Sequence, residues 1–183
     1  PGPILSDPAH PFIPDEVEYR FAQPSKPFMG ASTFRVADLS NPILQPWTRE
    51  ALRKRNEAVL AGKAGYTRQT ACRPNGVPVY LLYPVQPLFF GQTAKEVVMI
   101  TQFDHMIRHV YLNVPHSAKV TPSWHGESVG HYEGSTLVVD TIGLNDQVYA
   151  DNYRTPHTDK LHIVERYHTV EDGKVLQIDL HVE

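Results

Sequence analysis

The chain has a single cysteine, no long apolar run and none of the motifs that bind nucleotides or catalytic zinc. Cys72 is alone among 183 residues, so a disulfide within the chain is excluded. No run of about 18 apolar residues occurs, and no membrane span is predicted. Glycine-rich phosphate loops, dinucleotide fingerprints, HExxH helices and CxxC pairs are also absent. A nucleotide-dependent enzyme is therefore disfavoured, and neither a cofactor nor a metal is predicted.

An excess of positive charge is missing too. The chain has 17 Lys and Arg against 20 Asp and Glu, a formal net charge of -3. Binding to nucleic acid without sequence preference needs a concentrated basic face that displaces counterions. The most basic stretch, residues 49–73, has no interleaved aromatic side chain apart from Tyr66, and we interpret it as a solvated helix face. No nucleic-acid partner is predicted.

Proline is concentrated at the beginning of the chain. Residues 1–46 hold nine of the 16 prolines, which opposes regular helix there and predicts an extended arm. The arm also carries large apolar side chains, so we expect it to pack on the body of the protein rather than to swing free. The first residues, Pro-Gly-Pro, favour a processed or trimmed start, for which a removed signal peptide is one explanation.

The rest of the chain, residues 47–183, predicts a single β-barrel-like domain that contains one helix. Trp47, Leu52 and Val59 mark an apolar stripe over residues 47–62, and Gly62 is placed to end the helix.

From Val77 onward β-branched and aromatic residues dominate, which is typical of strands. Two short edge strands are expected at 79–83 and 88–90, followed by three hairpins: 97–103 with 106–112, 126–132 with 135–142, and 161–170 with 175–182. The predicted fold class is mainly β, an antiparallel meander forming a small barrel or a strongly curved sheet.

The second hairpin presents a candidate acid–base site. A turn at Glu133-Gly134 pairs Glu127 with Asp140, and strand alternation places His125 and His131 on the same face. Opposed carboxylates beside imidazoles suit proton transfer, or a divalent metal. The open alternative is that this face is exposed to solvent, with Tyr132, Leu137, Val139 and Thr141 on the buried side.

The other two hairpins supply further candidates. In the third, a turn at Asp172-Gly173 pairs Arg166 with Asp179 and leaves Glu165 as a lone acid among apolar neighbours. We expect Glu165 to be protonated or paired, with Arg108 as a structural partner, or to act as a catalytic or ligand-gripping acid. In the first, a turn at Asp104-His105 pairs Thr101 with Arg108 and Ile100 with His109. His105 and His109 are better explained as strand and turn residues than as a metal-binding pair.

Residues 143–160 form a long connection, which in a compact domain is usually functional. We interpret it as a lid over a barrel mouth, with His157 able to enter a pocket as a further catalytic candidate. The predicted ligand-binding residues are Arg108, His109, Trp124, Tyr132, Tyr153 and Tyr167.

The segment Gly126-Glu127-Ser128-Val129-Gly130 matches the Gly-x-Ser-x-Gly pattern of serine hydrolases, with Asp140 and His157 following in the appropriate order. That pattern works on a sharp turn from strand to helix, whereas an alternating strand surrounds Ser128. A serine hydrolase is therefore disfavoured.

The segment Pro122–Gly134, continuing Thr136–Gly143, resembles a family of uncharacterised exported bacterial β-rich proteins, and further matches lie at 72–78, 108–112 and 161–167. The resemblance implies a periplasmic or secreted setting and no catalytic residue. Together with the candidate residues, it leads to the hypothesis of an exported small-molecule-binding β-barrel, an acid–base lyase, isomerase or hydrolase. Open alternatives are a carrier without catalysis and an accessory subunit that binds a larger assembly through the proline-rich arm. A homo-oligomer also remains open.

Overall fold

The computed structural model describes residues 2–11, 35–63, 72–82, 87–102 and 105–183. The chain divides into two compact units, each described by itself below. The helix unit comprises Pro1–Arg73 and Asp151–Pro156, and the sheet unit comprises Pro74–Ala150 and His157–Glu183. Residues 12–34 of the predicted proline-rich arm lie outside the described residues, so its role in binding a larger assembly stays a prediction.

The helix unit is built around α1 (Pro46–Leu60), which confirms the predicted helix. Proline in the first turn costs no hydrogen bond, because the first N–H groups of a helix have no partner within it. The buried face carries Leu52, which packs with Ala37 and Leu44. The side chain of Asn56 accepts a bond from the Ala37 N–H and donates one to its carbonyl, both at 2.9 Å. Trp47 departs from the predicted apolar stripe, since it is 47% exposed.

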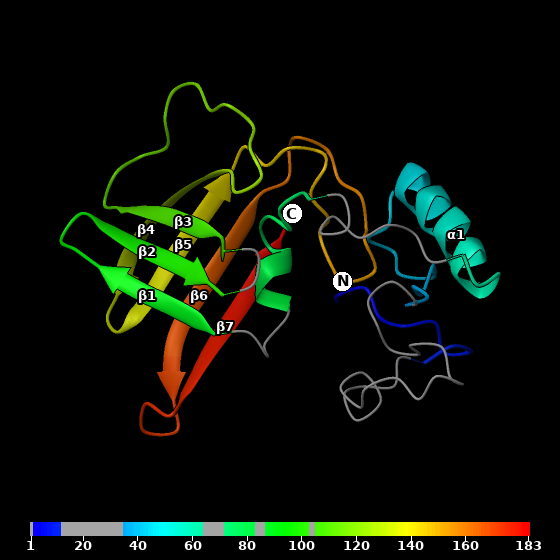
Figure 1. Cartoon of the computed structure of the whole chain (residues 1–183), viewed down its shortest axis with the longest axis horizontal. Coiled ribbons are helices and arrows are strands. Elements are labelled where there is room, and N and C mark those ends of the chain that lie inside the picture. The colour runs from blue at the N-terminus through cyan, green and yellow to red at the C-terminus, as the bar shows by residue number, and fades with distance from the viewer. Residues whose placement is uncertain (1, 12–34, 64–71, 83–86, 103–104) are drawn as a thin grey trace. The chain divides into compact units, whose positions relative to one another are not determined.

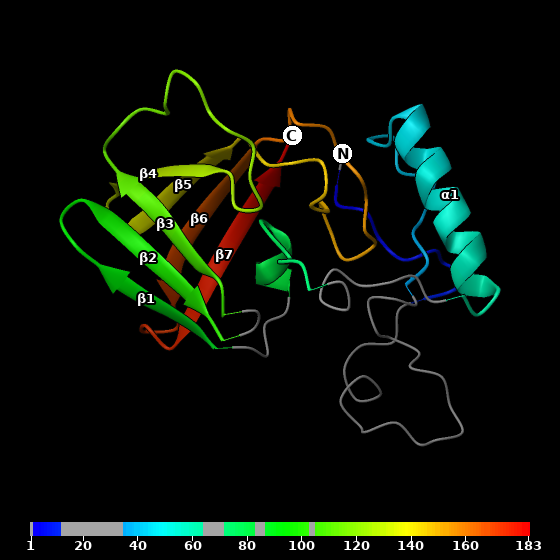
Figure 2. The same ribbon diagram turned by 45° about the horizontal axis from the view of Figure 1, so that its top comes forward.

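The sheet unit is one seven-stranded mixed sheet that curls into a half-barrel, which confirms the predicted fold class (Figures 1 and 2). The strands lie side by side in chain order. Their bounds are β1 (Leu88–Gln92), β2 (Glu96–Thr101), β3 (Ile107–Leu112), β4 (Glu127–Glu133), β5 (Thr136–Ile142), β6 (Ile163–Val170) and β7 (Val175–Val182). Side chains from the concave face make the core of the unit, including Val110, Val139 and Ile163, each fully buried.

One expected strand is wrong. The apolar run at 79–83 forms a short 3-10 helix, η3 (Val79–Leu82), over its described residues. Pro78 and Pro84 flank this run, and proline cannot donate to a strand ladder, which opposes pairing on both sides. Val79 and Tyr80 satisfy their apolar character by burial in the core instead.

A second correction concerns the meander, which is not antiparallel throughout. β3 and β4 are parallel, paired from Val110–Ser128 to Leu112–Gly130. Parallel neighbours need a connection that returns along the sheet, of a dozen or more residues. Residues 113–126, called the crossover below, provide it (Figure 1).

Two of the three predicted hairpin registers are wrong by two residues. Glu127 pairs with Ile142, and Asp140 pairs with Val129, so the two carboxylates are not directly opposed. The turn residues are Gly134 and Ser135 rather than Glu133 and Gly134, because the positive φ of 61° at the first turn position suits glycine.

In the β2–β3 hairpin, Arg108 pairs with Met99 instead of Thr101, and Ile100 pairs with Ile107 instead of His109. The β6–β7 register is as predicted, with Arg166 opposite Asp179.

Candidate functional site

The concave face of the sheet holds a buried ion pair between Arg108 of β3 and Glu165 of β6. Their side chains are 2% and 0% exposed, so neither charge reaches water. The guanidinium donates two bonds to the carboxylate, Nη1 to Oε1 at 2.9 Å and Nη2 to Oε2 at 2.5 Å. The structural pairing considered for Glu165 is therefore present.

Arg108 has no donor left for a ligand. Its Nε donates to Ser128 Oγ at 3.0 Å, Nη1 to the Tyr80 hydroxyl at 2.6 Å and Nη2 to Thr141 Oγ1 at 2.7 Å. With the two bonds to Glu165, all five N–H groups of the guanidinium have acceptors. Burial raises the pKa of Tyr80 to about 12, so its hydroxyl stays protonated. We call this set the interior network, and its saturation indicates a structural role.

The convex face carries the carboxylates predicted for acid–base work, joined by a residue that the sequence did not single out. His116 of the crossover lies between them, with Nδ1 3.0 Å from Glu127 Oε1 and Nε2 2.9 Å from Asp140 Oδ1. Both imidazole nitrogens therefore face acceptor-only groups if the carboxylates are ionised. Glu127 also accepts bonds from the Ser117 N–H at 2.7 Å and hydroxyl at 2.6 Å.

The chain of groups continues across β5 to β7. His162 Nε2 lies 3.0 Å from the same oxygen of Asp140, and its Nδ1 lies 3.4 Å from Glu183 Oε2. We call Glu127, His116, Asp140, His162 and Glu183 the outer-face chain. It is partly exposed, with 22% of the His116 side chain and 40% of the Asp140 side chain accessible.

The contacts of the outer-face chain shift the pKa values of its members. Hydrogen bonds from Ser117 and His116 lower the pKa of Glu127. Partial burial works to raise the pKa of Asp140, but the bonds from His116 and His162 outweigh it, and the pKa falls. Burial works to lower the pKa of His162, yet its bond to Asp140 raises it. Both carboxylates are therefore ionised at neutral pH and weak as proton acceptors.

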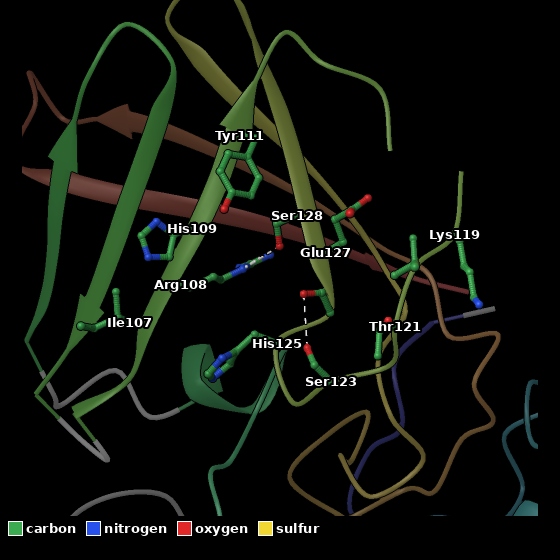
Figure 3. A pocket seen from close by; sticks show the side chains of 12 residues that line it. Ile107, Arg108, His109, Tyr111, Lys119, Thr121, Ser123, His125, Glu127 and Ser128 are labelled. Carbon is green, nitrogen blue, oxygen red and sulfur yellow. Dashed lines mark hydrogen bonds between the residues drawn. The ribbon is translucent and has the colours of Figure 1, made fainter. Parts of the chain in front are cut away.

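A pocket of about 460 Å³ lies where β3 and β4 have not yet begun to pair (Figure 3). One side comes from β3 and the other from the crossover and the beginning of β4. Its lining residues are Ile107, Arg108, His109, Tyr111, Lys119, Val120, Thr121, Ser123, His125, Gly126, Glu127 and Ser128. Polar groups from two separate segments of the chain thus converge on one space.

His125 is a lining residue whose side chain has unused hydrogen-bonding capacity. Its Nε2 is buried and has no hydrogen-bond partner among the described residues. Burial, and then the nearby positive charge of Arg108, lower the pKa of His125 below its ordinary 6.5. The imidazole is therefore neutral at pH 7, the form that accepts a proton or shares a hydrogen bond with a ligand.

The other predicted site residues lie apart from this pocket or at its edge. His109 lines it, but its Nδ1 lies 2.9 Å from Glu96 Oε2. His131 is exposed and bonded to Glu133, and the Tyr132 hydroxyl donates to the Gln92 side chain.

Four predicted residues have contacts elsewhere. The carbonyl of Trp124 accepts a bond from the Val77 N–H, and His157 Nδ1 lies 2.7 Å from the Thr158 carbonyl. Tyr153 belongs to the helix unit, where its hydroxyl bonds with Ser6, and Tyr167 belongs to the interior network.

Sequence reasoning missed His116, which connects Glu127 with Asp140, and Ser117, which donates two hydrogen bonds to Glu127. Strand alternation places side chains only within paired strands, and both residues lie in the crossover. The available signal was the loop itself, because a Pro-His-Ser triplet (115–117) lies shortly after the strand that carries Arg108, and loops often hold functional residues.

Ser128 does not occupy the exposed turn that a nucleophilic serine needs. It lies inside β4, is 2% exposed and bonds with Arg108 and Thr141.

In the part of the chain that the structure describes, no cluster of three or more His, Cys, Asp or Glu is arranged to hold a metal ion. None of the helices described there has the length and apolar character to cross a membrane. No family model, curated protein or solved structure matches the chain.

Proposed function

We propose that the sheet unit binds a small polar molecule in the pocket between β3, β4 and the crossover, with His125 as its central hydrogen-bonding contact. The observation that carries this proposal is the buried Nε2 of His125, a pocket-lining residue, which has no hydrogen-bond partner among the described residues. A buried polar atom without a partner costs about 1–3 kcal/mol, and a ligand that bonds to it recovers that loss.

The pocket also has dimensions that suit such a ligand. Small-molecule sites usually enclose about 300–1,000 Å³ and present a few convergent polar groups. Here Thr121 and Ser123 contribute hydroxyls, and Lys119 contributes an ammonium group. A ligand with both neutral and acidic oxygen atoms would find partners on the crossover side.

The proposal includes acid–base chemistry, with His125 rather than Glu127 or Asp140 as the proton acceptor. Both carboxylates accept hydrogen bonds that stabilise their ionised form, which weakens them as bases. His125 is neutral near pH 7, and its Nε2 has no hydrogen-bond partner among the described residues, so this nitrogen can take the role of a general base. A carrier would use the same pocket and the same hydrogen bond without proton transfer.

Two variants of His125 separate binding from catalysis. Ligand-observed NMR against a library of small alcohols, amides and carboxylic acids identifies binders of the unmodified protein. We expect His125→Ala to weaken these binders about tenfold, the value of one hydrogen bond of about 1.4 kcal/mol. His125→Gln keeps a hydrogen-bonding side chain without a titratable nitrogen, so it retains binding but loses turnover of any binder that reacts.

The matched control is His131→Ala, an exposed imidazole on the strand that follows. It should leave binding unchanged. If His125→Ala changes the affinity of no library member, or if both alanine variants lower the affinities equally, the proposed site is wrong.

We also propose an exported setting, which the resemblance of residues 122–143 supports. Fusion of the complete gene product to a reporter that is active only outside the cytoplasm tests it, and an inactive fusion that accumulates in the cytoplasm would contradict it.

A further inference from the structure

The crossover is attached to the sheet in three places, and the attachments differ in kind. At its beginning the Asn113 N–H donates to the Gly130 carbonyl at 2.8 Å. At its end Ser123 exchanges backbone bonds with Gly143 and Asn145, at 3.0 and 2.9 Å. In the described chain, the hydrogen bonds between these two ends come from His116 and Ser117 and all reach Glu127 or Asp140. The middle of the crossover is thus attached through ionisable side chains.

His116 can make both of its bonds only as the imidazolium ion. A neutral imidazole has one N–H donor and one lone pair, whereas a carboxylate accepts and cannot donate. With Glu127 at one nitrogen and Asp140 at the other, loss of a proton turns one attractive contact into a repulsive one. The same holds for His162, which lies between Asp140 and Glu183.

We propose that the crossover is a pH-dependent wall of the pocket, closed while His116 carries both protons and loosened when it loses one. The same residues that follow His116 in the crossover line the pocket, namely Lys119, Val120, Thr121 and Ser123. Loosening the wall therefore opens the pocket. The effect on ligand binding rests on the function proposed above, whereas the loosening itself does not.

Several ionisable groups surround His116, two in direct contact and the others through Asp140. Glu127 of β4 and Asp140 of β5 contact it directly, and His162 and Glu183 act through Asp140. His181 touches Glu183 at the far end.

The pKa of His162 lies above 6.5 because of its bond to Asp140, so its contribution is complete below that pH and disappears as pH rises through the higher value. The pKa values of Glu127 and Asp140 lie below 4.5 and 3.8, so their contribution is lost only in stronger acid. The wall is closed in mild acid and loosens toward alkaline pH.

Amide hydrogen exchange of the full chain without ligand, followed by mass spectrometry from about pH 5 to about pH 8.5, tests the wall directly. After correction for the intrinsic pH dependence of exchange, protection of peptides from residues 113–122 should fall about tenfold with rising pH, the value of one charge-assisted bond of about 1.4 kcal/mol. Peptides from α1, whose described ion pairs involve no histidine, should show no comparable change.

Variants assign the effect to His116. His116→Asn, which cannot carry a charge, and His116→Ala should show the loosened crossover at every pH, while His131→Ala should behave as the unmodified protein. A pH-independent crossover in the unmodified protein, or normal pH dependence in His116→Asn, would overturn the proposal. Since no ligand is used, a failure here is distinct from a failure to find binders through His125.

Discussion

The two faces of the same strands carry two kinds of ion pair. On the concave face, Arg108 and Glu165 form a pair with no access to water. On the convex face, His116 joins Glu127 and Asp140 in a partly exposed chain. The first cation is permanent, since an arginine side chain is always protonated in proteins, whereas the second is an imidazole, which is charged only while it holds a second proton.

The buried pair has a structural role, whereas we propose that the partly exposed chain responds to pH. The interior network satisfies every donor of Arg108, so a ligand could bind there only by breaking existing bonds. The outer-face chain depends on protons that solvent can remove. Glu165, which the sequence made a candidate catalytic acid, therefore belongs to the interior network and has a structural role.

The largest effect should come from removing one half of the interior pair. Arg108→Met leaves the Glu165 carboxylate buried without its cation, and we expect the free energy of unfolding to fall by about 3–5 kcal/mol. The double variant Arg108→Met with Glu165→Leu should recover most of that loss, because no isolated charge remains. Urea denaturation at pH 7 measures both. Equal losses in the single and double variants would show that the pair is not the origin of the effect.

A smaller effect is expected when the network loses one neutral member. Tyr80→Phe removes a hydroxyl that bonds with Arg108 at 2.6 Å and with the Tyr167 hydroxyl at 3.0 Å. The cost should be about 1–3 kcal/mol, since an Arg108 donor is left without an acceptor. The exposed Tyr132→Phe is the control, because its hydroxyl bonds only with Gln92 among the described residues. Denaturation curves that coincide for the two variants would contradict the difference between the faces.

The smallest effect, and the one that changes with pH, should come from the outer-face chain. We expect His162→Ala to cost less than about 1 kcal/mol near pH 6, as is usual for exposed ion pairs. The difference from the unmodified protein should vanish near pH 9, because the raised pKa of His162 makes its contribution a low-pH one. Thermal unfolding across this range measures it, and a difference that grows with pH would contradict the assignment.

How far the sequence predicts this molecule depends on whether a property repeats along a strand. The face of a side chain follows from alternation, and an error of two residues in a hairpin register leaves it unchanged. Leu137, Val139 and Thr141 are therefore buried as expected on the alternative in which Glu127 and Asp140 point outward, although the partner of Glu127 is wrong. Tyr132, expected on the same buried side, is 43% exposed.

Neighbours in space were harder to predict than faces. The pairing of Glu165 with Arg108 could be inferred, because a buried carboxylate needs a cation and the predicted strands carry few cationic side chains. The contact between His116 and Asp140 could not be inferred, because side chains of the crossover do not alternate between two faces as they do in a strand. The parallel β3–β4 pair also has no turn signal in the sequence. It was missed for that reason.

The β3–β4 pair also has a consequence for the order in which the strands of the sheet fold. Three pairs of opposite residues join β3 and β4, compared with seven in β4–β5 and eight in β6–β7. Hairpins close locally, whereas this pair must wait for the whole crossover to be spanned and its loop-closure entropy to be overcome. We expect β1–β3 and β4–β7 to assemble as separate subassemblies that dock last along this seam. The β3–β4 pair borders the pocket, so the final step of folding would also complete the proposed binding site.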